Sequence, residues 1–174
     1  MQLDQQSSHS PPQPIQPAGF FSGIGVRPIV LGVVADYIAT YVAIYAYFFV
    51  YLAKELSKRG EVTPEMISEY MLSTEGLLIG FTIGALGTAL GGFVAGYKAG
   101  KFEMKHGAFV GAASLIVSFI QQGIQEEASQ LPEWFRLLSL LAIIPAGALG
   151  GYVAQVFKGL AGPHRSPGGT WPDA

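Results

Sequence analysis

The stretch GLLIGFTIGALGTALGGFVAGY, residues 76–97, contains no charged side chain. A helix that crosses a bilayer needs about 20 consecutive and mostly apolar residues, so this stretch predicts a transmembrane helix. Glycine recurs along it every three or four residues, which leaves one side of the predicted helix almost bare of side chains.

Three further stretches are also mostly apolar, at residues 28–52, 107–120 and 134–157, with Asp36 in the first and Arg136 in the last. The third of the four spans in chain order, residues 107–120, is short and is followed by two glutamines. A water-soluble bundle of buried helices is disfavoured, because four such runs leave almost no polar face to meet water. The sequence therefore predicts an all-α membrane protein with four transmembrane helices.

Composition agrees with this prediction and excludes several classes of function. Apolar residues make up 50% of the 174 residues and charged residues only 13%, against about 25% in soluble domains. The net charge of -2 gives no basic surface for nucleic acid. Three scattered histidines and no cysteine argue against a metal site. No phosphate-binding loop or nucleophile motif is present, so we expect neither a cofactor nor an enzyme.

The transmembrane domain is expected at residues 26–158, between cytoplasmic tails at 1–25 and 159–174 that we expect to be disordered. Cytoplasmic loops of membrane proteins carry an excess of Lys and Arg. One side of the predicted bundle carries Arg27, Lys98, Lys101, Lys105, Lys158 and Arg165, and the other carries Lys54, Lys58, Arg59 and Arg136. The loop 121–133 has no basic residue and holds Glu126, Glu127 and Glu133. This asymmetry predicts that both termini lie in the cytoplasm.

The segment 63–75 has the signature of a short helix on the outer side. Thr63 is suited to the N-cap, Pro64 to the first turn, and Glu65 to the positive end of the helix dipole. The apolar face consists of Met66, Ile67, Tyr70 and Met71. An amphipathic helix on the outer leaflet fits this pattern, and a helix packed over the end of the bundle fits it equally well.

A short phrase occurs twice. The sequence ALGGFVA at residues 89–95 returns as ALGGYVA at 148–154. The two spans that contain the phrases should cross the membrane in the same direction, which suggests two tandem helix hairpins related by a parallel duplication.

The small residues line faces typical of close helix packing, a pattern called a glycine zipper. The glycines expected to pack are Gly76, Gly80, Gly84, Gly87, Gly91, Gly92, Gly107, Gly111, Gly150 and Gly151. Packing within the four-helix bundle accounts for these faces. The functional alternative is a pore, or self-association with a second copy or another membrane protein.

Asp36 is the candidate functional residue, because a carboxyl group deep in a span is costly. It lies at the edge of the small-residue face of its helix, so we expect it to point into the bundle. Tyr37, Tyr41, Tyr45 and Phe48 are expected on the opposite, lipid-facing side. Asp36 is either a proton or cation site, or a protonated or hydrogen-bonded group that ties its span to Thr82, Thr88 or Ser114. His106, at the start of the third span, is expected to be an ordinary interfacial residue.

The stretch from Gly91 to Gly111 resembles small bacterial four-helix membrane proteins of unknown function. In these a GG-x-x-AG helix leads through a basic turn to an H-G-x-x-x-G helix, as at residues 91–96 and 106–111 here. The resemblance implies a bacterial inner-membrane protein and no particular activity.

Two functions stay open at this point. The first is a non-enzymatic structural or accessory protein of the bilayer, packed through its glycine faces. The second is a small proton-coupled transporter or channel subunit that uses Asp36.

Overall fold

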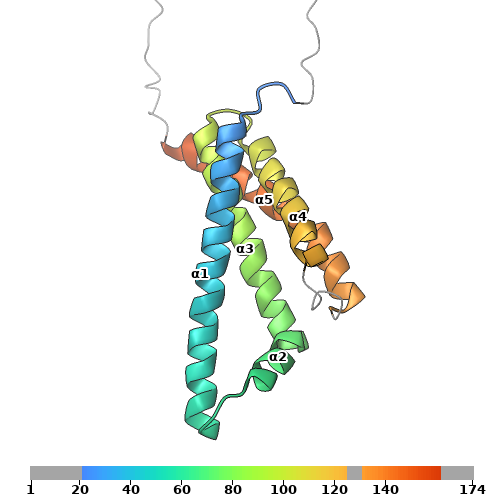
Figure 1. The fold of residues 1–174 in the computed structure, drawn as a ribbon. Coiled ribbons are helices and arrows are strands. Elements are labelled where there is room, and N and C mark those ends of the chain that lie inside the picture. Colours follow the sequence, from blue (N-terminus) through green and yellow to red (C-terminus); the bar gives the residue numbers. More distant parts are fainter. Residues whose placement is uncertain (1–20, 125–130, 162–174) are drawn as a thin grey trace, which may run out of the picture.

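The computed structural model describes residues 21–124 and 131–161, and these form five helices and no strand (Figure 1). The helices are α1 (Val26–Arg59), α2 (Pro64–Leu72), α3 (Thr74–Ala99), α4 (Glu103–Ile124) and α5 (Glu133–Ala161). Three of them, α1, α3 and α5, are long and apolar enough to cross a membrane. The described part of the chain is therefore all-helical, and its three long apolar helices indicate a membrane protein.

Helix α4 differs from the other long helices in its ends. It contains the stretch 107–120 but extends to polar residues on both sides, from Glu103 to the pair Gln121 and Gln122. Most of the expected tail residues, 1–20 and 162–174, and the acidic loop residues Glu126 and Glu127, lie outside the described residues.

Helix α2 forms where the sequence places it. The Thr63 hydroxyl accepts a hydrogen bond from the Met66 N–H at 3.4 Å, and Pro64 is the first helical residue. Ser73 ends α2 and caps α3, where its hydroxyl accepts from the Gly76 N–H at 3.1 Å. The turn between α1 and α2 begins at Gly60, whose φ of 80° is a left-handed conformation that glycine adopts without strain.

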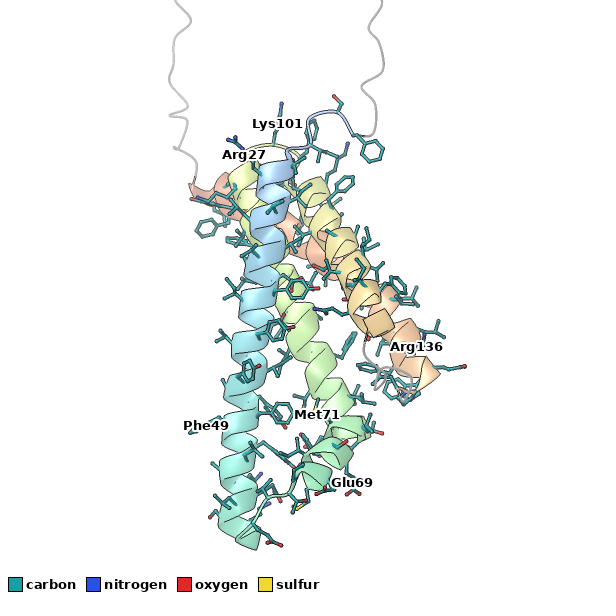
Figure 2. The ribbon with its side chains drawn as sticks, in the orientation of Figure 1. Arg27, Phe49, Glu69, Met71, Lys101 and Arg136 are labelled. Carbon is teal, nitrogen blue, oxygen red and sulfur yellow. The ribbon has the colours of Figure 1, made fainter. Side chains whose placement is uncertain are left out.

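Helix α3 is central and packs against α1, α4 and α5. The ends of α1 and α5 that lie nearest the chain termini are at the same end of the bundle as the α3–α4 turn, at the top of Figure 1. We call this the basic end, because Arg27 and Lys101 lie there (Figure 2). Toward α2, helices α1 and α3 move apart from each other and from α4 and α5 (Figure 1).

The basic end is held by backbone-to-backbone contact at glycines. A Cβ atom on Gly92 would overlap the backbone of Gly147 in α5, and one on Gly91 would meet the Gly32 carbonyl of α1. The two repeated phrases pack against each other, since a Cβ on Gly150 would overlap the Ala89 carbonyl. Other glycines with close neighbours are Gly32, Gly87, Gly96, Gly107, Gly111, Gly147 and Gly151. Small residues allow these helices to approach closely, as expected for packing in lipid.

Two glycines of α3 do not follow the packing prediction. No described atom lies within 4 Å of where a Cβ on Gly80 or Gly84 would stand. The prediction that these two contact another helix is wrong, because they lie where α3 has already diverged from its neighbours. Gly76 is tight, but against Tyr70 and Met71 of the short helix α2 rather than against a long helix.

Candidate functional site

Asp36 lies where three helices meet, and its side chain is only 4% exposed. The Ser114 hydroxyl of α4 donates to Asp36 Oδ2 at 2.6 Å, and the Thr88 hydroxyl of α3 donates to the same oxygen at 3.1 Å. The Thr40 hydroxyl, one turn along α1, donates to Oδ1 at 3.3 Å. One carboxyl group thus joins α1, α3 and α4 through hydroxyl donors.

Of the three residues predicted as hydrogen-bond partners of Asp36, two, Thr88 and Ser114, do bond to it. Thr88 and Ser114 are themselves almost fully buried, at 3% and 2% exposure. Thr82 is not a partner, because it is exposed and its hydroxyl donates to the Leu78 carbonyl within its own helix. Thr40 was missed, although its spacing of four residues from Asp36 places the two side chains on one face of a helix.

Asp36 also lines a cavity of about 320 Å³ between α1, α3, α4 and α5. The polar residues that line it are Asp36, Thr40, Thr88, Ser114, Ser118, Gln121 and Ser139. The aromatic residues are Tyr37, Tyr41, Phe81 and Phe135. None of these described lining residues is basic, so Asp36 carries the formal charge of the cavity.

The cavity extends from Asp36 away from the basic end. Along α1 it reaches from Asp36 to Ile44, which is eight residues or about 12 Å at the helical rise of 1.5 Å. It reaches Gly80 along α3, and Gln121 and Phe135 at the ends of α4 and α5 that lie far from the basic end. The glycines that fail to pack, Gly80 and Gly84, form part of its wall.

The aromatic side of α1 also differs from the prediction. Tyr37 and Tyr41 were expected to face lipid, yet both line the cavity, although Tyr41 is also 46% exposed. Their rings lie 6.2 Å apart between centroids. The divergence of α1 from α4 makes room for these rings beside Asp36, and a reading of α1 alone as a helical wheel does not show that space. Tyr45 is 70% exposed, in keeping with a lipid-facing position.

His106 is not the ordinary interfacial residue that its position suggested. It is 1% exposed, and its Nε2 accepts from the Gly25 N–H at 2.9 Å. An accepting Nε2 requires the proton on Nδ1, which donates to the Phe102 carbonyl at 3.0 Å. His106 is thus a neutral ring that ties the residue before α1 to the start of α4.

A second tie at the basic end involves Lys158. Its ammonium donates to the Gly96 carbonyl at 3.0 Å and pairs with Glu103 at 3.2 Å. It therefore joins α3, the start of α4 and the last turns of α5. Lys158, His106 and the glycine contacts therefore hold the helices together at the basic end. The cavity lies on the other side of Asp36.

The described residues contain no group of three or more His, Cys, Asp or Glu that could hold a metal ion. What the site offers chemically is one acid that can exchange a proton or balance one positive charge. Comparisons with protein families, with curated proteins and with solved structures find no match for this chain.

Proposed function

We propose that the chain crosses the bilayer four times, with α4 as the fourth spanning helix beside α1, α3 and α5. Its 22 residues correspond to about 33 Å, enough for a hydrocarbon core of about 30 Å. The contacts of α4 with α3 and α5 and the bond from Ser114 to Asp36 support this, since they keep α4 inside the bundle.

The proposed orientation places the basic end, and with it both termini, in the cytoplasm. The basic end carries Arg27, Lys98, Lys101, Lys105 and Lys158 with one carboxylate, Glu103. The opposite end, which includes α2 and Arg136 (Figure 2), carries four basic residues, Lys54, Lys58, Arg59 and Arg136, among six carboxylates, Glu55, Glu61, Glu65, Glu69, Glu75 and Glu133. The bacterial inner membrane is the proposed location because of the resemblance noted in the sequence, and α2 then lies on the outer side.

Cysteine labelling tests the orientation cleanly, because the chain has no cysteine of its own. Lys101→Cys and Glu65→Cys introduce single thiols at exposed positions on opposite ends. In intact cells a membrane-impermeant maleimide should label the cysteine at 65 and spare the one at 101, and both should label after lysis. The opposite pattern in intact cells would overturn the proposed orientation.

For the function itself, we propose a non-enzymatic, small proton-coupled transporter or channel subunit in which Asp36 carries the proton. One observation carries this proposal: the buried carboxyl group of Asp36 lines a cavity of about 320 Å³ that leads toward one end of the bundle. An acid buried in a membrane bundle is costly and is usually kept for a functional reason. Ser118, Gln121 and Ser139 continue the polar lining beyond Asp36 and supply partners for water or a solute.

A structural or accessory role is the second candidate, and one observation favours it. The Asp36 carboxyl accepts from three hydroxyls, as a group that only fastens helices would do. Such a tie needs no cavity beside it, however, and the glycine contacts already hold the same helices together at the basic end. The cavity therefore favours the transporter.

Proteoliposomes distinguish the two candidates. The full chain is reconstituted with a pH-sensitive dye in the lumen, a pH gradient is imposed, and solutes from cationic, neutral and anionic classes are added outside. We expect proton movement, alone or driven by at least one class, in the wild type and not in Asp36→Asn. Asp36→Asn keeps an amide oxygen toward Thr88 and Ser114, so it should still fold. Equal traces for wild type, Asp36→Asn and empty liposomes in every arm would refute the transporter and leave the structural role.

A further inference from the structure

We infer that the cavity beside Asp36 binds a small organic monocation, such as an aryl or alkyl ammonium, in exchange for the Asp36 proton. The inference rests on the proposed function and names the class of solute that the site takes. It is carried by the charge of the cavity, by its aromatic wall and by the end of the bundle to which it leads.

The charge of the cavity determines the sign and number of charges on the ligand. Asp36 is the one ionisable acid among the lining residues, and no basic residue stands beside it. A carboxyl group can be neutralised by a proton or by one bound cation, but not by both at once. Binding of a monocation therefore releases one proton, and the site stays neutral in both states.

The walls of the cavity favour an organic cation over an inorganic one. Four aromatic residues, Tyr37, Tyr41, Phe81 and Phe135, line the cavity together with Asp36. Aromatic faces attract ammonium groups through their quadrupole and also receive the hydrocarbon part of a ligand. A volume of about 320 Å³ is at the small end of the range for ligand pockets and far exceeds what a dehydrated ion needs.

The surroundings of the cavity also suit a cation. It extends away from the basic end, toward the end where six glutamates outnumber the four basic residues Lys54, Lys58, Arg59 and Arg136. A surface with an excess of one charge raises the local concentration of ligands of the opposite charge. An anionic solute would meet that acidic end first and then an acid with no basic partner in the lining.

Titration calorimetry on the purified full chain tests the inference, with benzyltrimethylammonium as the probe and benzyl alcohol as a neutral aromatic control. Measurements in two buffers of different ionisation enthalpy give the number of protons released. We expect binding of the cation only, release of one proton, and an apparent affinity that rises by up to about tenfold per pH unit while Asp36 holds its proton. Asp36→Asn should weaken binding at least about a hundredfold and abolish the proton release.

A matched pair of variants tests the aromatic wall. Phe81→Leu removes a ring that lines the cavity, whereas Phe49→Leu makes the same change at a ring that is 76% exposed and points away from the bundle (Figure 2). We expect about tenfold weaker binding for Phe81→Leu and no change for Phe49→Leu. Equal affinities for the two variants would refute the aromatic contribution.

The outcomes separate this inference from the function on which it rests. Proton movement in proteoliposomes that depends on Asp36 but responds only to neutral or anionic solutes would overturn the inference and leave the transporter standing. Cation binding with no proton release, in a chain that moves no protons, would refute both the exchange and the transporter. Equal binding of benzyl alcohol and the cation would reduce the site to an apolar cavity and refute the inference.

Discussion

The two ends of the bundle use glycine in opposite ways. At the basic end, Gly91 and Gly92 bring the backbone of α3 against α1 and α5, where no Cβ fits. About two to three turns earlier on the same helix, no described atom lies within 4 Å of where a Cβ on Gly80 or Gly84 would stand, and both glycines line the cavity beside Asp36. Glycines on one helix thus allow close packing in one half of the protein and leave room for a cavity in the other. Spacing alone does not separate the two uses, because the divergence of the neighbouring helices decides between them.

The largest expected effect compares Gly92→Ala with Gly84→Ala. The added methyl group at 92 would overlap the backbone of Gly147, which cannot move aside as a flexible side chain could. Overpacking of this kind costs about 3 kcal/mol of unfolding free energy. At 84 the methyl group meets open space, and Ala is favoured over Gly in a helix by about 1 kcal/mol.

Unfolding in detergent micelles, followed by circular dichroism, measures this difference. Gly92→Ala should lower the midpoint strongly, whereas Gly84→Ala should leave it unchanged or raise it. If both variants shifted the midpoint equally, the contrast between the two ends of α3 would not exist.

The second prediction concerns the point where the two halves meet. Asp36→Leu removes the acceptor of Thr88 and Ser114 and leaves both hydroxyls buried without it, at a cost of about 2 kcal/mol. Asp36→Asn retains an acceptor oxygen and should cost less than half of that. The same unfolding assay gives both values. Equal stability of Asp36→Leu and the wild type would show that Asp36 does not tie the helices together.

Much of this architecture is predictable from the sequence, because helix formation in lipid depends on local composition. The apolar runs predict α1, α3 and α5, and the Thr63-Pro64 pair predicts the start of α2. The side of α1 that carries Asp36 also follows from the positions of its small residues. These features depend on residues that are close together in the chain.

The cavity is not predictable in the same way. Tyr37 and Tyr41 line it although they were predicted on the side of α1 opposite its small-residue face, and Phe135 and Ser139 reach it from a distant helix. Their meeting depends on the angles at which the long helices diverge from one another. The burial of His106 likewise depends on Gly25, 81 residues away in the chain.

The third prediction tests the closure of the basic end with Lys158→Met. The change removes the ammonium that reaches both the Gly96 carbonyl and Glu103, while it keeps a long apolar side chain. We expect a loss of about 1 kcal/mol, because the contact is partly exposed. Lys98→Met, at an exposed lysine of the same end, is the control and should have no measurable effect. A loss of the same size at Lys98 would mean that net charge, rather than the contact, is responsible.

The smallest effect is expected at the far end, where Tyr70 holds α2 against α1. Its ring stacks on Tyr51 with centroids 4.0 Å apart, and its hydroxyl pairs with that of Tyr47. Tyr70→Phe keeps the ring and removes the hydroxyl pairing, so we expect a cost of only about 0.5–1 kcal/mol. Tyr45→Phe, at an exposed ring of α1, is the matched control and should cost nothing.

The pH dependence of this contact has a definite sign. Burial, and next to it the hydrogen bond with Tyr47, raises the pKa of Tyr70 above its ordinary value. A group whose pKa is higher in the folded than in the unfolded protein contributes stability below the unfolded pKa, about 10 for tyrosine, and loses it as the pH rises through the folded value. The contact of Tyr70 with α1, which keeps α2 in place, should therefore persist at neutral pH and weaken only in alkaline solution. The difference between the phenolate absorbance titrations of wild type and Tyr70→Phe isolates this group, and it should titrate well above pH 10. A difference curve centred near pH 10 would place Tyr70 in open solvent and detach α2 from the bundle.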